Sequence, residues 1–203
     1  MKIIVRFAIT SVAALSLALV TGCGSKKATT PSSTKYEAEP STKDEVVANL
    51  PCSGSEFFSA DKDFRGSASG ESLDQMTARK KALSNAKAQL AGDVNSVMQT
   101  VGGNYIKSSG INNKELALEH FEQHTRAIVD RELRDVSQIC EKQTKVESTG
   151  KYKYYVAIEL SGYELVDAYN ETLSKDEIFK AGYSYEKFKQ AFDEEMVKYT
   201  RGN

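Results

Sequence analysis

The sequence predicts an α+β fold, a small antiparallel sheet covered by helices, from three observations. Residues 72–101 place apolar side chains at steps of three or four, which is the period of one helix face. Residues 152–160 alternate between two faces, as a strand does. Residues 163–203 contain helix-start signals followed by helical periodicity. The predicted order is strand, long helix, helix, β-hairpin and a C-terminal helical extension.

The long helix over residues 72–101 carries a stripe of small and medium apolar side chains. Ser72 with Gln75 predicts a capping box at its start, and Gly102 with Gly103 predicts its end. Because alanine lets a backbone approach its neighbour closely, we expect this helix to lie flat on a sheet. Its apolar face is formed by Ala78, Ala82, Ala86, Leu90, Val94, Val97 and Val101.

The strand expected under that helix is formed by residues 64–70, FRGSASG, whose small side chains suit close packing. Residues 105–110 are expected to form a loop or a frayed helix end. A second helix is predicted over residues 114–133, with Asn112 or Asn113 as its N-cap. Its predicted apolar face consists of Leu118, Phe121, Thr125, Ile128 and Val129.

A β-hairpin is predicted after the second helix. Residues 134–147 predict a strand whose alternation is interrupted near Ile139 and Cys140, which indicates a β-bulge. Residues 148–151 predict the hairpin turn that leads into the strand over residues 152–160. The apolar face of this second strand consists of Tyr152, Tyr154, Val156, Ile158 and Leu160.

The C-terminal part of the chain is predicted to be helical. Residues 163–173 predict a short helix, and a second capping box of Ser174 and Glu177 predicts the start of another. Ser184 predicts the N-cap of the last helix. The apolar face of this last helix consists of Tyr185, Phe188, Phe192, Met196 and Tyr199.

The first 22 residues predict a signal peptide. Lys2 and Arg6 form a positive N-terminal region, and an apolar run over residues 7–20 follows. The segment LVTGC, which ends at Cys23, resembles the lipobox of bacterial lipoproteins. This resemblance implies that Cys23 is acylated and becomes the first residue after cleavage, which anchors the protein to a membrane. The alternative is an ordinary signal peptide with a chance cysteine.

The rest of the chain predicts a tether followed by one domain. Residues 23–45 are rich in Ser, Thr, Lys and Pro and have few large apolar side chains, which predicts a disordered tether. Residues 46–203 predict a single α+β domain whose helical C-terminal part covers residues 163–203. No aspartate follows Cys23, and by resemblance to envelope lipoproteins this favours the outer membrane, facing the periplasm.

The charge balance argues against a nucleic-acid partner. Residues 23–203 carry 25 Lys and Arg against 28 Asp and Glu. A nucleic-acid-binding domain needs a basic face, so we expect no such partner. The expected partners are the membrane, through the lipid, and a protein or the cell wall.

Two cysteines, Cys52 and Cys140, remain once Cys23 is assigned to lipid. In an oxidising compartment they are expected either to form a disulfide or to be two small buried apolar side chains. The sequence leaves this choice open.

Residues 64–160 resemble the LPP-twenty family of bacterial envelope lipoproteins. The similarity is carried by a strand with Gly66 and Ala68, by the alanine-spaced helix that includes Leu90, and by a distant strand that contains YYV. The segment LPCSGSEFF before the first strand is also similar to lipoproteins of this type. The resemblance implies an envelope lipoprotein with an α+β domain, some of whose relatives serve motility or surface structures. It implies no catalytic residues.

His120 and His124 are the candidate metal ligands. They lie four residues apart on the second predicted helix, so their side chains share one face. The sequence EHFEQH lacks the glutamate placement of the zinc-peptidase motif HExxH, so peptidase chemistry is not predicted. The alternative is a solvated helix face with two titratable side chains.

The leading functional interpretation is a non-enzymatic interaction or structural module, anchored by lipid in the envelope. The sequence contains no CxxC motif and no phosphate-binding glycine loop, and we predict neither catalytic residues nor a cofactor. The alternative is an accessory lipoprotein that binds a metal or small ligand through His120 and His124. A third interpretation, a hydrolase of envelope material, needs a cleft of converging acids.

Overall fold

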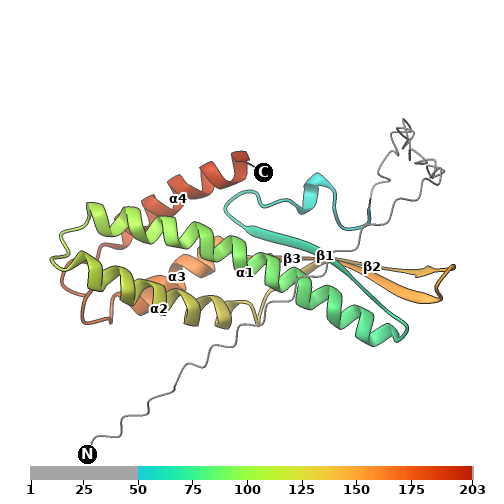
Figure 1. Cartoon of the computed structure of the whole chain (residues 1–203). Helices are drawn as coiled ribbons and strands as arrows, with labels where there is room; N and C mark the ends of the chain where they lie inside the picture. Colours follow the sequence, from blue (N-terminus) through green and yellow to red (C-terminus); the bar gives the residue numbers. More distant parts are fainter. Residues whose placement is uncertain (1–49, 203) are drawn as a thin grey trace, which may run out of the picture. The chain divides into compact units, whose positions relative to one another are not determined.

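The structure is a computed structural model that describes residues 50–202, within one compact unit, Glu45–Asn203. The predicted signal peptide, Cys23 and the tether lie outside the described residues. The α+β class is confirmed (Figure 1). The elements in chain order are η1 (Ser55–Phe57), β1 (Phe64–Ser72), α1 (Gln75–Ser108), α2 (Lys114–Glu132), β2 (Ser137–Val146), β3 (Lys151–Leu160), α3 (Gly162–Leu173) and α4 (Tyr185–Gly202).

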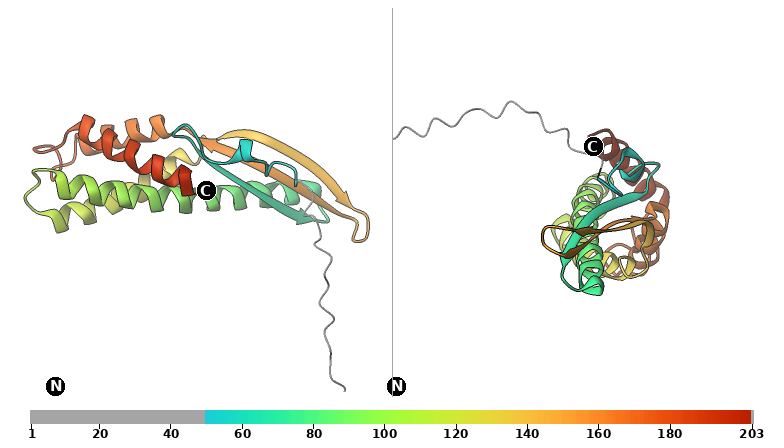
Figure 2. Two further views of the ribbon diagram at one scale, coloured as in Figure 1. Left: turned by 90° about the horizontal axis from the view of Figure 1, so that it is seen from above. Right: turned by 90° about the vertical axis from the view of Figure 1, so that its right-hand side faces the viewer.

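The sheet has three antiparallel strands in the order β1-β3-β2, with β3 in the centre. Its register pairs Phe64 with Leu160 on one side of β3 and Ser137 with Glu159 on the other. The predicted bulge is confirmed, because the register of β2 shifts between Gln138 and Cys140. Figure 2 shows the N-terminal half of α1 running along the sheet, and α2, α3 and α4 packed beside its C-terminal half.

The close approach of α1 to the sheet depends on small side chains on both surfaces. Ala78, Ala82 and Ala86 are fully buried, as predicted. A Cβ added at Gly70 of β1 would lie 2.4 Å from the backbone nitrogen of Ala82. At Gly66 the nearest backbone atom, the oxygen of Ala86, would be 3.1 Å away. The helix therefore lies on the strand at nearly backbone contact.

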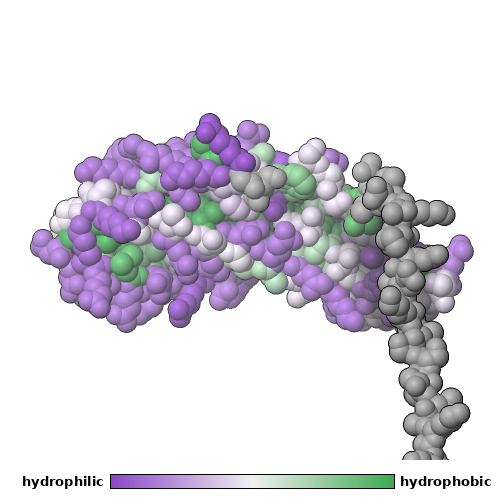
Figure 3. Space-filling model, turned by 45° about the horizontal axis from the view of Figure 1, so that its top comes forward, coloured by the Kyte–Doolittle hydropathy of each residue, from purple (hydrophilic) through white to green (hydrophobic). Residues whose placement is uncertain are grey.

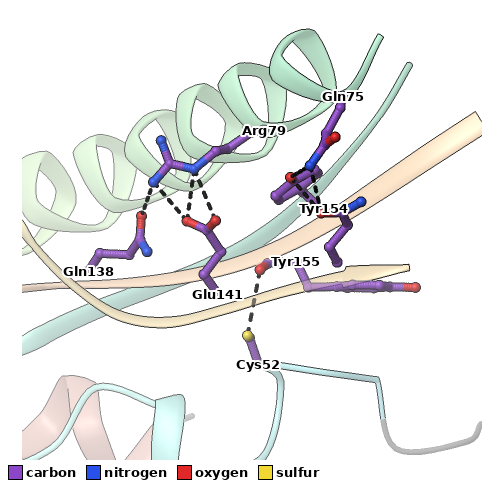
Figure 4. Close-up of polar contacts among 8 residues, drawn as sticks. Cys52, Gln75, Arg79, Gln138, Glu141, Tyr154 and Tyr155 are labelled. Carbon is purple, nitrogen blue, oxygen red and sulfur yellow. Dashed lines mark hydrogen bonds and ion pairs between the residues drawn. The ribbon is translucent and has the colours of Figure 1, made fainter. Parts of the chain in front are cut away.

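Polar side chains also join α1 to the sheet (Figure 4). The Arg79 Nε donates to both carboxylate oxygens of Glu141 on β2, at 3.0 Å each. The Gln75 Nε2 donates to the hydroxyl oxygen of Tyr154 on β3 at 2.8 Å. The hydrogen bonds from Arg79 lower the pKa of the Glu141 carboxyl, which stays ionised near neutral pH.

The ends of α1 differ from the prediction. Its N-cap is Asp74, whose carboxylate accepts from the Thr77 N–H at 2.7 Å, while the Ser72 hydroxyl only accepts from the Asp74 N–H. The predicted capping box of Ser72 and Gln75 is therefore wrong. The helix also continues through Gly102 and Gly103 to Ser108, where a loop or frayed end was predicted. Packing explains this continuation, because Tyr105 and Ile106 are almost completely buried.

The two adjacent glycines of α1 give a matched pair of variants. A Cβ at Gly102 would lie 2.3 Å from the ring of Phe121, whereas a Cβ at Gly103 has no neighbour within 4 Å. We expect Gly103→Ala to raise the free energy of unfolding by up to about 1 kcal/mol, because alanine favours the helix. Gly102→Ala is expected to lower it by about 1–3 kcal/mol through overpacking. Urea unfolding measures both, and equal effects would contradict the described contact of α1 with Phe121.

The predictions for α2 and for the C-terminal region are partly confirmed. Asn113 is the N-cap of α2, and its side chain accepts from the Leu116 N–H at 3.1 Å. Leu118, however, is 40 % exposed, and Ala117 is buried in its place. The predicted capping box at Ser174 is also wrong, because residues 174–184 form turns and no α-helix. There the side chain of Asp176 accepts backbone hydrogen bonds instead.

The helices beyond the sheet pack around an aromatic core. Phe121 of α2 stacks on Tyr169 of α3 with ring centroids 5.4 Å apart, and Phe188 of α4 lies 5.6 Å from Tyr169. The buried Tyr169 hydroxyl donates to the Thr125 hydroxyl at 3.0 Å, so it is not left unpaired. Phe179, from the turns before α4, is also fully buried. Among the described residues no helix is long and apolar enough to cross a bilayer.

Candidate metal centre

Two histidines of α2 and one aspartate from the turns after α3 form the candidate metal centre. The His120 Nδ1 lies 3.2 Å from the Asp176 Oδ2, and the His124 Nε2 lies 2.8 Å from the same oxygen. All three ligand atoms lie within 4.8 Å of one another. The structure thus adds a third potential ligand, from a distant part of the chain, to the two predicted from the sequence.

The local fold aims both histidines at one point. They are four residues apart on α2, and Phe121 and Thr125 between and beside them are buried against the domain. This orientation leaves the two imidazoles side by side at the edge of the buried face, where they are 34 % and 28 % exposed. Both rings are therefore largely covered, whereas the alternative from the sequence was a solvated helix face.

Asp176 is oriented by its own backbone neighbours. Its Oδ1 accepts from the backbone N–H groups of Ile178 at 2.8 Å and Phe179 at 3.2 Å. Its Oδ2 is left to face both imidazoles, and the side chain is only 9 % exposed. Such hydrogen bonds to the outer oxygen of a carboxylate fix the direction of the inner one, as in the supporting shell of metal sites.

The hydrogen bonds at Asp176 also keep it ionised. Burial alone would raise the pKa of this carboxyl, but the hydrogen bonds from His124, from His120 and from the two backbone N–H groups together lower the pKa to about 2. A carboxyl whose pKa is lower in the folded state stabilises the fold above its ordinary pKa of 3.8. This stabilisation is lost as the pH falls from there toward 2. At neutral pH the Asp176 carboxylate is therefore ionised.

The three ligand atoms suit a small divalent ion. A tetrahedral Zn²⁺ bound at about 2.0–2.1 Å holds neighbouring ligand atoms about 3.3 Å apart. The two nitrogen–oxygen distances, 3.2 and 2.8 Å, are near that value, and the three ligand atoms lie within 4.8 Å of one another, so the side chains must draw together around the ion. Two imidazoles and a carboxylate leave one coordination position for water or another group.

No spacing in the sequence marks Asp176 as a ligand, because it lies 52 residues from His124. The residues around Asp176 show only a local pattern, which concerns its own backbone neighbours. An aspartate two and three residues before Ile178 and Phe179 can accept their N–H groups, which is the pattern of a turn or N-cap. Ser174 and Glu177 form a competing capping-box pattern, which predicts a helix start at Ser174 instead.

The remaining predicted site residues lie elsewhere. Cys52 and Cys140 form a disulfide with an S–S distance of 2.09 Å, which joins the segment before η1 to β2. The Cys52 Sγ also lies 3.6 Å from the carbonyl oxygen of Tyr155 on β3 (Figure 4). This disulfide holds the N-terminal segment on the sheet, at a distance in sequence of 88 residues. Cys23 lies outside the described residues.

No protein-family model matches the chain, and neither a curated protein nor a solved structure is similar to it. The resemblance to the LPP-twenty lipoproteins therefore stays a prediction.

Proposed function

We propose that this protein is a lipid-anchored envelope protein whose domain binds one Zn²⁺ ion at His120, His124 and Asp176. The observation that carries the proposal is the convergence of three ligand atoms, from α2 and from the turns after α3, within 4.8 Å. The lipid anchor at Cys23 and the position at the outer membrane, facing the periplasm, come from the sequence alone. The proposed role is metal binding without catalysis.

The chemistry of the donors favours Zn²⁺. Imidazole nitrogen and carboxylate oxygen are both ordinary zinc ligands, whereas Ca²⁺ and Mg²⁺ prefer sites made of oxygen alone. The ionised Asp176 supplies one negative charge, which offsets part of the charge of the ion. Because the rings are partly exposed and one position stays open, we expect reversible binding, and a side chain of a partner can complete the coordination.

The test is a zinc titration of the purified full-length protein in detergent, in competition with a chromophoric chelator. We expect one ion per chain, and binding that weakens as the pH falls because protons compete for the imidazole nitrogens. His124→Ala and Asp176→Asn are each expected to weaken binding at least about tenfold, since each removes one of three protein ligands.

Glu122→Gln is the matched control, because Glu122 is an exposed acid on the same helix and is not part of the centre. It is expected to bind zinc as the wild type does. Equal affinity in the wild type, His124→Ala and Asp176→Asn would show that zinc binds elsewhere and would refute the proposal. Asp176→Asn keeps the shape of the side chain and an oxygen for the backbone N–H groups, and circular dichroism of the variant checks that the loss of the charge leaves it folded.

An interaction module remains the second candidate, and exposed apolar side chains favour it. The face shown in Figure 3 is mostly hydrophilic with small, separate apolar areas. Leu73, in the turn between β1 and α1, is however 72 % exposed, and Met76, in the first turn of α1, is 55 % exposed. A photo-crosslinking residue at Leu73, used in whole envelopes with and without the Cys23→Ala change, tests this candidate. A partner that depends on the anchor supports it, and crosslinks no stronger than those from an exposed residue of α2 count against it.

A further inference from the structure

A surface pocket of about 270 Å³, which shares no residue with the metal centre, lies where β1, α1, α4 and the segment before β1 meet. Its walls differ in chemistry. Phe57 and Phe58 contribute aromatic rings, and Phe58 is 49 % exposed. The other walls carry hydrogen-bonding side chains, among them those of Arg65, Gln89 and Asp93.

Arg65 contributes a fixed wall and N–H hydrogen-bond donors to the pocket, but little net charge. Its Nε donates to the Glu159 Oε2 at 2.6 Å, in an ion pair that is mostly covered. Its Nη1 donates to the backbone oxygens of Glu56 and Phe58, at 3.1 and 3.2 Å. The guanidinium is therefore already neutralised and held in place, and it ties the aromatic segment to β1. An anionic ligand finds no unpaired positive charge at this position.

Asp93 of α1 supplies a carboxyl group to the lining of the pocket. Burial raises the pKa of this carboxyl, and a hydrogen bond with Tyr199 of α4 lowers it in part. The pocket thus combines acceptors and donors in fixed positions without a strong field of either sign. A purely apolar ligand would displace water from these polar groups without replacing the hydrogen bonds that water makes to their remaining donors and acceptors, which is unfavourable.

From this geometry we propose that the pocket is a saccharide-binding site. A pyranose ring has one face of C–H groups that stacks on an aromatic side chain, here Phe58, and a rim of hydroxyl groups that bond to carboxylate, amide and guanidinium groups. The volume is just below the range of about 300–1,000 Å³ typical of small-molecule sites, so it suits one sugar unit of a longer chain. Given the proposed envelope location, an N-acetylated sugar of an envelope glycan is the expected ligand.

The experiment titrates the full-length protein in detergent with the β-1,4-linked trisaccharide of N-acetylglucosamine, followed by saturation-transfer NMR. We expect saturable binding with a dissociation constant of roughly millimolar order. Phe58→Ser and Asp93→Leu are each expected to weaken it at least about tenfold, because one removes the stacking surface and the other removes hydrogen bonds to a charged group.

Leu118→Ser is the matched control for Phe58→Ser, because both replace an exposed apolar side chain and Leu118 does not line the pocket. It is expected to bind the trisaccharide as the wild type does. Absence of saturable binding, or equal binding in Phe58→Ser, Asp93→Leu and the wild type, would overturn the proposal. The experiment needs neither zinc nor the membrane, so its failure is distinct from failure of the metal site or of the envelope location.

Discussion

Gly70→Val is expected to prevent the domain from folding. The added Cβ alone would lie 2.4 Å from the backbone nitrogen of Ala82 and 2.7 Å from the backbone oxygen of Ala78. Backbone atoms cannot rotate away as a side chain can, so α1 must move off β1. Overpacking costs about 1–3 kcal/mol when side chains can adjust, and we expect more here. Since a domain is stable by only about 5–15 kcal/mol, circular dichroism is expected to show loss of the cooperative unfolding transition.

Gly92→Ala is the control for this variant. Gly92 lies on the exposed side of α1, where an added Cβ has no neighbour within 4 Å. Alanine at this position is expected to raise the free energy of unfolding by up to about 1 kcal/mol, because it favours the helix. If Gly70→Val unfolds at the urea concentration of the wild type, α1 does not contact β1 as the structure describes.

Removal of the disulfide is expected to have the second-largest effect. Cys52 and Cys140 close a loop with a sequence separation of 88 residues. In the chain-entropy model such a link stabilises the folded state by about 4–5 kcal/mol, because it restricts the unfolded chain. Cys52→Ser and Cys140→Ser are each expected to lower the free energy of unfolding by about this amount, measured by urea unfolding without reductant.

The double variant Cys52→Ser/Cys140→Ser provides the internal check. A reductant is expected to destabilise the wild type to the level of the double variant and to leave the double variant unchanged. A wild-type protein that keeps its stability in reductant would show that the two sulfur atoms are not linked in solution. Two free thiols in the non-reduced, unfolded wild type would show the same.

Most of the fold followed from short-range patterns in the sequence. The alternation in β3 and the alanine stripe of α1 each indicate which side of the element is buried, and the structure confirms these buried sides. The interruption near Ile139 indicates a β-bulge, which the structure also confirms. The ends of α1 were predicted less well. Propensity places a stop at Gly102 and Gly103, but burial of Tyr105 by distant parts of the chain outweighs it. Only the tertiary fold reveals that contribution.

For the same reason, the sequence predicts the two histidines of the candidate site but not the aspartate. The spacing of His120 and His124 on one helix is a local property, so the sequence shows it. The approach of Asp176 depends on how the turns after α3 pack on α2, through Phe179 against Phe121. The pocket at Phe58 and Asp93 likewise joins four parts of the chain, and no spacing in the sequence indicates it.

The most direct test of the metal centre is zinc K-edge X-ray absorption of the full-length protein loaded with one equivalent of Zn²⁺. We predict a first shell of nitrogen and oxygen atoms only, at about 2.0–2.1 Å, with the scattering pattern of two imidazoles. In His124→Ala one imidazole is expected to be lost. A sulfur shell near 2.3 Å, or the spectrum of hydrated zinc without imidazole, would contradict binding by His120, His124 and Asp176.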